Sequence, residues 1–340
     1  MDNYELVDLF AGAGGLGVAA RGLGVLGVGI EWDKSACATR RAAGLATQEG
    51  DVRDLSPSDF PSANILAGGP PCQTYNFAGT GAGRHALTEA QDLIQRMARR
   101  EDVTARLAQL EDLRGHLVLE PLRWALDAID SDRPYEAVVL AQVPTVLPVW
   151  QATGDVLSAE GYSVAYGMLR AEEYGVPQTR RYAVLIARRQ GTALLPKATH
   201  QPFSKKGSTA PGDPSLRPCV TMGEVLDRPE PFTVVSNYGI GGDPKARGRR
   251  TSAQPAATVS GKIFRCRVVT EDDAALDRLS ASEAGQLQSF PKNYPWTGQD
   301  KGQQIGNATP PLLASHILAA ALDLAVQSTR PMETMSSPSW

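Results

Sequence analysis

The chain has 340 residues, of which 42% are hydrophobic, and a formal net charge of −3. This length and apolar content suffice for one large core and one smaller lobe. No run approaches the ~20 apolar residues that cross a bilayer, and no signal peptide is visible, so we expect no membrane and a cytoplasmic location. The four cysteines show no paired or metal-binding spacing, which argues against a disulfide framework and a metal site.

The N-terminus predicts a strand over residues 5–10 and a glycine-rich turn over 11–17 that opens a helix. Glycines at such a turn let a ligand lie against backbone N–H groups at the start of the helix. The turn alone is compatible with NAD, a flavin or a nucleotide. We assign ligand contacts here to Phe10, Gly12, Gly14, Gly15 and Leu16.

Two further predicted strand ends carry acidic or aromatic groups. The apolar segment 26–30 runs into Glu31 and Trp32, and the next strand closes on Asp51 and Val52. Carboxyl ends of parallel strands meet at one edge of a sheet, where ligands bind. Glu31 is placed to accept from ribose hydroxyls, Trp32 to lie on an adenine, and Asp51 to receive an adenine amino group. Together with the turn, the pattern predicts a ligand that contains adenosine.

Residues 68–73 read Gly-Gly-Pro-Pro-Cys-Gln and follow an apolar run over 63–67 that is typical of a buried strand. The glycines allow a sharp turn and the prolines stiffen it, which holds the Cys72 thiol in one direction. A lone cysteine is usually a buried residue that fills space. The two glycines and two prolines before it favour a nucleophile instead. We count Pro70 among the residues around the ligand.

Five segments that follow one another along nearly the whole chain resemble the motifs of the DNA cytosine-5 methyltransferase family. They are Asp-Leu-Phe-Ala-Gly-Ala-Gly-Gly at 8–15, Pro-Cys-Gln at 71–73, Gln-Thr-Arg-Arg at 178–181, Leu-Gln-Ser-Phe-Pro at 287–291 and Gln-Ile-Gly-Asn-Ala-Thr-Pro-Pro at 304–311. The resemblance implies an α/β, doubly wound Rossmann-like domain that binds S-adenosyl-L-methionine, with a smaller, loop-rich target-recognition domain. It also implies double-stranded DNA as partner, a nucleoid-associated monomer, and Asn307 near the cofactor.

The resemblance further implies a mechanism. Cys72 attacks C6 of a pyrimidine, which makes C5 ready to take a methyl group, and the base first leaves the duplex because C6 is stacked there. In related enzymes a Glu hydrogen-bonds N3 and an Arg binds O2, so that both stabilise charge that develops in the transition state.

The chain departs from the family at this pocket. Ala141 stands where the family has the Glu, followed by Gln142, and Tyr182 stands where it has the second Arg after Arg180; Asn76 replaces a serine. Gln142 is placed to contact the Watson–Crick edge. Loss of both charges removes a pair without stranding one partner. We interpret the pocket as rebuilt, with activity on plain cytosine reduced or redirected. Two alternatives stay open: a catalytically impaired methyltransferase-fold DNA-binding protein, and an engineered Glu-to-Ala variant, which would not explain Tyr182.

Composition divides the chain into a cofactor-binding catalytic domain over 1–191, a target-recognition domain over 192–269, a return to the catalytic domain over 270–327 and a flexible tail over 328–340. Residues 273–287 and 310–326 are predicted to be helical.

Positive charge is concentrated in a few places, which a DNA-binding protein of net negative charge requires. A polar helix pair is predicted within 80–130, preceded by a glycine-containing loop that could close over DNA. Basic loops are predicted at 245–250 and 262–267, in the segment where the family places target recognition. The residues assigned to DNA are Arg84, Arg247, Arg249, Arg250, Lys262 and Arg265.

Overall fold

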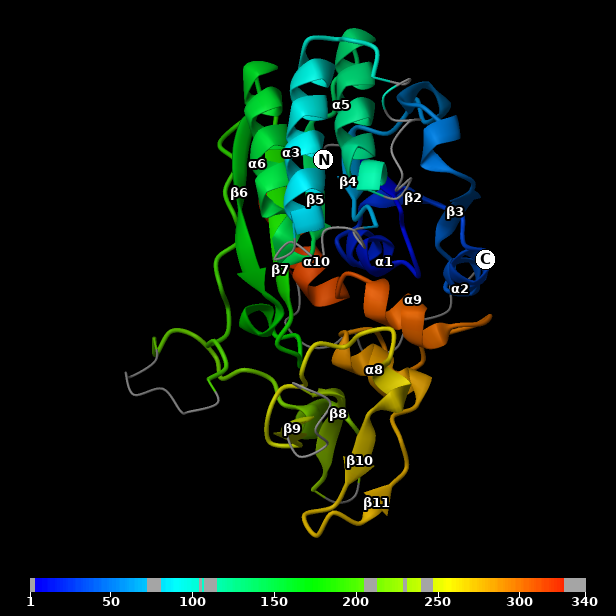
Figure 1. Cartoon of the computed structure of the whole chain (residues 1–340), viewed down its shortest axis with the longest axis vertical. Helices are drawn as coiled ribbons and strands as arrows, with labels where there is room; N and C mark the ends of the chain where they lie inside the picture. The colour runs from blue at the N-terminus through cyan, green and yellow to red at the C-terminus, as the bar shows by residue number, and fades with distance from the viewer. Residues whose placement is uncertain are drawn as a thin grey trace.

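The computed structural model describes residues 4–71, 81–103, 106, 115–204, 213–228, 231–239 and 247–326, and at 81–86, 115–116 and 238–239 the backbone alone. A seven-stranded sheet with helices on both faces forms the larger part, and a four-stranded sheet lies at the lower end of the molecule in Figure 1.

The large sheet has the order β3-β2-β1-β4-β5-β7-β6. Its strands are β1 Glu5–Leu9, β2 Leu26–Glu31, β3 Ala46–Glu49, β4 Ile65–Gly68, β5 Ala137–Gln142, β6 Ser163–Arg170 and β7 Arg181–Arg188. The neighbours from β3 to β5 pair in parallel, and β7 is antiparallel to both β5 and β6. The order reverses between β1 and β4, which places a ligand crevice at the carboxyl ends of these strands. This architecture confirms the predicted doubly wound α/β domain.

Helices cover both faces of this sheet. They are α1 Gly15–Gly22, α2 Lys34–Ala42, α3 Gly81–Ala98, α5 Glu120–Asp130, α6 Leu147–Ala159 and α10 Pro311–Leu322. Short 3-10 helices are η1 Val52–Asp54, η2 Pro57–Asp59, η4 Gly115–Leu119, η5 Pro144–Val146, η6 Ala171–Tyr174 and η9 Ile263–Arg265. In Figure 1, α3, α5 and α6 stand side by side in the upper part.

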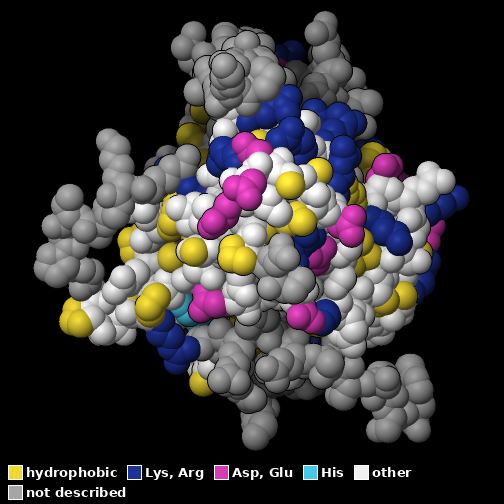
Figure 2. All heavy atoms as spheres, turned by 90° about the horizontal axis from the view of Figure 1, so that it is seen from below, with side chains coloured by type: hydrophobic (Ala, Val, Ile, Leu, Met, Phe, Trp, Pro, Cys, Tyr) yellow, Lys and Arg dark blue, Asp and Glu magenta, His cyan; other side chains and the backbone are white. Residues whose placement is uncertain are grey.

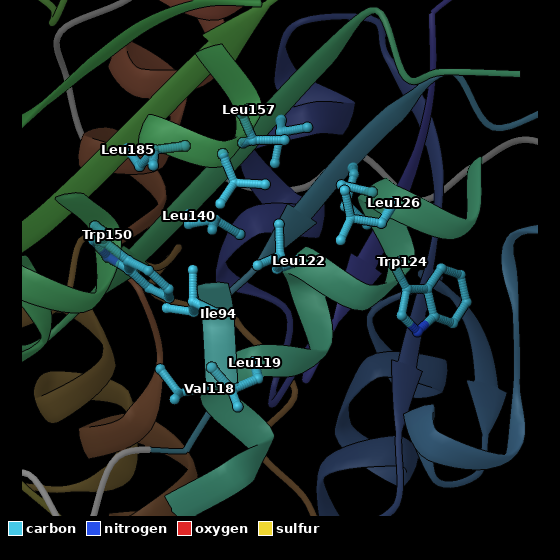
Figure 3. Packing of buried hydrophobic residues seen from close by; sticks show 14 of the residues in the cluster. Ile94, Val118, Leu119, Leu122, Trp124, Leu126, Leu140, Trp150, Leu157 and Leu185 are labelled. Carbon is cyan, nitrogen blue, oxygen red and sulfur yellow. The ribbon is translucent and has the colours of Figure 1, made fainter. Parts of the chain in front are cut away.

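Alternation along the strands divides the core into two layers. In β5, Val138 and Leu140 join the cluster formed with α3, α5 and α6, and Val139 and Ala141 join the cluster formed with α1 and α10. Figure 3 shows the first layer, where Leu140 lies among side chains from the covering helices. Strands buried on both faces read as continuous apolar runs, as residues 137–141 do.

The second sheet is antiparallel, in the order β11-β10-β8-β9. It is made of β8 Thr233–Gly239, β9 Arg247–Thr251, β10 Arg267–Val269 and β11 Ala275–Leu276. The short helices α7 Met222–Val225, α8 Ala281–Leu287 and α9 Lys301–Asn307 complete the described elements, and α8 and α9 lie between the two sheets in Figure 1. The hydrophobic cluster of the second sheet and these helices includes Ala13 and Val18, so the smaller part of the molecule packs against the larger one.

The helix predicted over 273–287 was too long. Residues 275–276 form β11, and α8 begins only after Ser280, whose hydroxyl accepts from the Glu283 backbone N–H while the Glu283 carboxylate accepts from the Ser280 N–H. The second sheet therefore runs beyond residue 269, and we propose that the return to the large domain starts near α8. The predicted helix over 310–326 is present as α10 but ends at Leu322, and the tail over 328–340 lies outside the described residues.

Within the described part of the chain, no helix has both the length and the apolar character needed to cross a membrane.

Candidate cofactor and catalytic site

A pocket of about 510 Å³ opens at the carboxyl edge of the large sheet. Seven of the residues predicted to bind the ligand line it: Phe10, Gly12, Glu31, Trp32, Asp51, Val52 and Asn307. Pro71, Gln142 and Arg180 line the same pocket, which therefore reaches the segment that leads into Cys72. Cys72 and Asn76 lie outside the described residues.

The glycine-rich turn leaves open space on the side of the pocket. Gly12 has φ +52°, and a Cβ there would meet no atom within 4 Å. Its N–H donates to Glu31 Oε2 at 2.8 Å. Phe10 also holds a positive φ, of 60°, which is unusual for a bulky residue. The result is a backbone wall that a ligand can approach closely.

Glu31 and Trp32 form the next part of the wall. The Glu31 carboxylate accepts from the backbone N–H groups of Gly12, Trp32 and Asp33 at 2.8–2.9 Å. Because a carboxylate accepts up to four hydrogen bonds, one position stays available for a ligand hydroxyl. Burial raises the pKa of Glu31 above its ordinary value, and these backbone donors offset only part of that rise. Trp32 is 56% exposed, and its ring offers a flat apolar surface beside Glu31.

Asp51 lines the pocket with a carboxylate that is already paired. Arg53 binds it through Nε and Nη2, the latter at 2.6 Å, and the Arg53 backbone N–H also donates to it. The hydrogen bond from the Arg53 side chain lowers the pKa of Asp51, so this group is anionic at neutral pH. An anion fixed at the pocket wall can accept from an amino group of a ligand.

The structure does not bring four of the predicted ligand residues into the pocket: Gly14, Gly15, Leu16 and Pro70. Gly14 caps α1 with φ +104°, and a Cβ there would lie 2.4 Å from Leu45. A Cβ at Gly15 would lie 1.9 Å from the carbonyl oxygen of Thr309, and Leu16 is buried in the core. These glycines permit close packing behind the turn, which the motif alone does not distinguish from ligand contact.

Gln142 binds the backbone that leads into Cys72. Its Nε2 donates to the carbonyl oxygen of Pro70 at 2.6 Å, and its Oε1 accepts from the Val143 N–H at 2.8 Å. Both ends of the carboxamide are therefore engaged by protein. In this geometry Gln142 holds the segment before Cys72. From the sequence we had expected its side chain to contact the Watson–Crick edge of the base.

Ala141 and Tyr182 lie in one apolar cluster, with exposed fractions of 3% and 2%. Ala141 pairs with Val184, two residues from Tyr182, so their side chains share a face of the sheet. Burial raises the pKa of Tyr182 to about 12, and its hydroxyl has no hydrogen-bond partner among the described residues. The Arg180 guanidinium lies 5.0 Å from the centre of the Tyr182 ring. The positions expected to carry a charge pair are thus neutral and closely packed.

Buried glutamines connect three of the segments that resemble family motifs, 178–181, 287–291 and 304–311. Gln178 Nε2 donates to the carbonyl oxygen of Leu287 at 3.1 Å and to Gln288 Oε1, while its Oε1 accepts from the Val259 N–H at 3.0 Å. Gln288 in turn donates to the carbonyl oxygen of Ile305 at 2.6 Å. These bonds join the segment before β7 to the end of α8, to Val259 and to α9, so both glutamines have a structural role.

Arg180 also joins these parts. Its Nη1 donates to the carbonyl oxygens of Gly306 and Val259. The guanidinium therefore lines the pocket while it holds the end of α9, next to Asn307.

Sequence reasoning missed several residues that line the pocket, among them Ser35, Leu117, Gln299, Asp300, Gln303 and Gln304. Gln304 reaches the site because its Oε1 accepts from Thr39 Oγ1 at 2.7 Å, which ties α9 to α2. No local pattern signals this contact between segments 265 residues apart. The available signals were that Gln304 begins the segment 304–311, which resembles a family motif, and that Gln303 lies near Asn307.

The arginines predicted to contact DNA differ in their structural surroundings. Arg84 lies in α3, not in the closing loop expected from its glycines, and its side chain is outside the described part. Arg249 is exposed and pairs with Asp273 at 2.6 Å. The Arg250 guanidinium lies 4.5 Å from the centre of the Phe203 ring and is half-buried, so packing is its main contact.

The other basic residues lie on the second sheet and its connections. Arg247 belongs to β9, so residues 247–250 of this basic segment form a strand and not the loop we expected, and 245–246 lie outside the described residues. Lys262 and Arg265 are exposed around η9. Figure 2 views the molecule from the end that carries this sheet, and Lys and Arg side chains gather over part of that face.

Comparison with known proteins decides the family. The chain matches the profile described as C-5 cytosine-specific DNA methylase over residues 4–99 and 147–229, more than half its length. The chain belongs to this family. It is therefore an S-adenosylmethionine-dependent DNA cytosine-5 methyltransferase by family, as the resemblance implied.

Relatives of this methyltransferase are similar over nearly its whole length. It is 26% identical to the Type II methyltransferase M1.HphI of Haemophilus parahaemolyticus, over 94% of this chain and 86% of that protein. It is 24% identical to M.HgiDI of Herpetosiphon aurantiacus, over 99% of both. Among solved structures, the Entamoeba histolytica methyltransferase EhMeth superposes with a TM-score of 0.64 and 12% identity over 95% of this chain and 99% of that one. The S. pombe Dnmt2 methyltransferase gives 0.63 and 14%, over 94% and 98%.

Proposed function

We propose that this methyltransferase binds S-adenosyl-L-methionine in the pocket and methylates C5 of a pyrimidine flipped out of double-stranded DNA. The main support is one pocket whose lining extends from the ends of β1, β2 and β3 to Gln142 and to Pro71, which directly precedes Cys72. Its relatives are named Type II methyltransferases, and we infer the same class of sequence-specific DNA modification here.

The pocket residues suit the cofactor. The exposed Trp32 ring fits an adenine face, the remaining acceptor position of Glu31 fits a ribose hydroxyl, and the anionic Asp51 fits an adenine amino group. Gly12 leaves room for a ligand against the backbone, and Asn307 lines the same pocket. When bound, the cofactor supplies an electrophilic methyl group.

The chain's own residues supply the rest of the chemistry. The Cys72 thiolate forms a bond from Sγ to C6, and the electrons of the 5,6 double bond move toward C5. After C5 has been methylated, loss of its proton re-forms the double bond and expels the thiolate. Gln142 holds the Pro70 carbonyl, which orients the stiff segment before the nucleophile.

The residues at positions 141 and 182 indicate that the activity of this methyltransferase differs from that of its relatives. Ala141 and Tyr182 carry no carboxylate and no guanidinium that could bind a cytosine, and both are buried in an apolar cluster outside the residues that line the pocket. Loss of one preorganised partner costs on the order of 10²–10³ in rate. The same observation supports the second candidate, a binding protein without turnover, and product analysis separates the two.

We expect wild-type protein, incubated with duplex DNA and labelled S-adenosylmethionine, to place the label on C5 of a pyrimidine, as read by mass spectrometry of nucleosides. Asp51→Ala should raise the KM for the cofactor about tenfold, since an anionic acceptor is removed. Asp54→Ala, an exposed acid outside the pocket, is the matched control and should change nothing. Absence of labelled nucleoside would favour the binding protein, and an unchanged KM would remove Asp51 from the site.

The logarithm of the DNA affinity should fall linearly with the logarithm of salt concentration if the second sheet binds the DNA. Arg249→Ala combined with Arg265→Ala should flatten this slope by about 1–2, roughly 0.9 for each phosphate that the variant no longer neutralises. Arg99→Ala is the control, because Arg99 is exposed and paired with Glu101 as Arg249 is with Asp273. Fluorescence anisotropy over a salt series measures the slope, and equal slopes for all three proteins would contradict this placement.

A further inference from the structure

Two buried side chains from distant parts of the chain bind the carbonyl groups of the glycine-rich turn. Tyr294 Oη donates to the carbonyl oxygen of Ala13, and Arg40 Nη1 donates to that of Ala11 at 3.4 Å. Tyr294 is 4% exposed and Arg40 is 1% exposed. Neither side chain lines the pocket, so both act from behind the turn.

The Arg40 guanidinium is held in a fixed place between α2 and the sheet. Its Nε donates to Thr47 Oγ1 at 3.2 Å and its Nη2 donates to the carbonyl oxygen of Ala46 at 3.1 Å. A Cβ at Gly29 would lie 2.0 Å from Nη2, so the missing side chain at this position is what admits the guanidinium. Arg40 therefore links the glycine-rich turn to β3.

Asp8 supplies the opposite charge near this guanidinium. It pairs in register with Gly29, which places its side chain on the same face of the sheet. It is 1% exposed, and neither carboxylate oxygen has a hydrogen-bond partner among the described residues. Burial raises the pKa of Asp8 to about 7 and Arg40 lowers it. The ionised fraction of Asp8 at neutral pH offsets part of the cost of keeping Arg40 in the interior.

Tyr294 is oriented independently of the bond that it makes to the turn. Its ring packs against Phe290 and Trp296, with centroid distances of 4.6 and 4.8 Å. Its hydroxyl would lie 3.0 Å from a Cβ at Gly14. Burial raises the pKa of Tyr294, so the hydroxyl stays a neutral donor. Removing this hydroxyl alone should leave the ring in place.

We propose that Tyr294 and Arg40 are positioning residues for the cofactor. They bind the carbonyls of Ala13 and Ala11 and so hold the turn in the conformation in which the Gly12 N–H meets Glu31 and the pocket wall stays open. This inference rests on the proposed function, because it assumes that the cofactor occupies the pocket.

Tyr294→Phe tests the proposal with the smallest change. Tyr162→Phe is its matched control, because Tyr162 is also 4% exposed and its hydroxyl donates to a backbone carbonyl, that of Tyr135, at 2.8 Å, away from the turn. By calorimetry with S-adenosylmethionine, Tyr294→Phe should raise the Kd about two- to tenfold, the value of one net hydrogen bond. Tyr162→Phe should leave the Kd unchanged. In turnover, Tyr294→Phe should raise the KM for the cofactor and keep kcat.

Arg40→Lys provides a second variant that retains the charge. The ammonium group of lysine cannot replace the three guanidinium N–H donors, which point in fixed directions. The Kd for S-adenosylmethionine should therefore rise in Arg40→Lys as it does in Tyr294→Phe. Wild-type protein that binds no cofactor would overturn the proposed function and this inference with it. Wild-type binding together with unchanged affinity in Tyr294→Phe and Arg40→Lys would overturn the inference alone. Equal weakening in Tyr162→Phe would do the same, because it would trace the effect to general stability.

Discussion

Cys72→Ser should abolish covalent capture of a duplex whose target pyrimidine carries fluorine at C5. In the wild type, methylation of the adduct leaves no C5 proton to remove, so protein and DNA should stay joined on a denaturing gel. A serine hydroxyl is far less ionised than a thiol near neutral pH. Methyl transfer to ordinary DNA should fall by about 10³-fold or more, as loss of a covalent nucleophile does in other enzymes.

Cys219→Ser is the control for this experiment. Cys219 is a free, half-buried thiol in the segment before α7, so its replacement should leave both the adduct and the turnover intact. An adduct that survives Cys72→Ser would place the nucleophile elsewhere. Absence of adduct and product in the wild type would favour the binding protein on a methyltransferase fold.

Ala141→Glu should lower the free energy of unfolding by about 3–5 kcal/mol, because the new carboxylate would be buried without a partner. Its surroundings are the apolar cluster that contains Tyr182 and Val184. Ala141→Leu separates size from charge, since it adds similar volume, and overpacking alone costs about 1–3 kcal/mol. Denaturant unfolding measures both variants, and equal losses would show that the site tolerates a charge.

Tyr182→Arg combined with Ala141→Glu should recover part of that loss. Alone, the new guanidinium would lie close to Arg180, which now stacks on the Tyr182 ring. Together, the two new groups can pair, and the double-mutant cycle should show a favourable coupling of about 1–3 kcal/mol. Additive losses would mean that the two positions do not meet across the sheet.

The same double variant tests what the present pocket is for. Cytosine methylation should rise by on the order of 10²–10³ if the wild-type pocket is only impaired. If the pocket has been rebuilt for another base, the double variant should gain cytosine activity and lose the wild-type product. Mass spectrometry of nucleosides reads both outcomes from one digest.

Much of the fold could be predicted because its signals are local. Strands form at residues 5–9, 26–31 and 65–68, close to the apolar runs over 5–10, 26–30 and 63–67 that predicted them, since a strand that enters the core reads as a short apolar run. The helix over 273–287 was predicted too long because nothing local marks β11 as a strand. β11 has only two residues, and they form a strand because they pair with β10 in the folded protein.

The ligand residues divide in the same way. Glu31 and Asp51 were found because each lies at the carboxyl end of a strand, and strand ends meet at one edge. Gly14 and Gly15 have the same motif signal as Gly12, yet they face Leu45 and Thr309 behind the turn. A glycine that admits a ligand and one that admits a neighbouring segment look alike in a sequence.

By itself the sequence determined the resemblance to the family, the first strands of the large sheet, the candidate nucleophile Cys72 and the two departures at Ala141 and Tyr182, because each of these is a matter of residue type and spacing. Only the tertiary structure decided that the two departures share one apolar cluster, that Gln142 binds the loop before Cys72, and that Tyr294 reaches Ala13. The physical reason is distance along the chain. Tyr294 and Ala13 are 281 residues apart, and a hydrogen bond over that separation exists only after the second sheet has packed against the first.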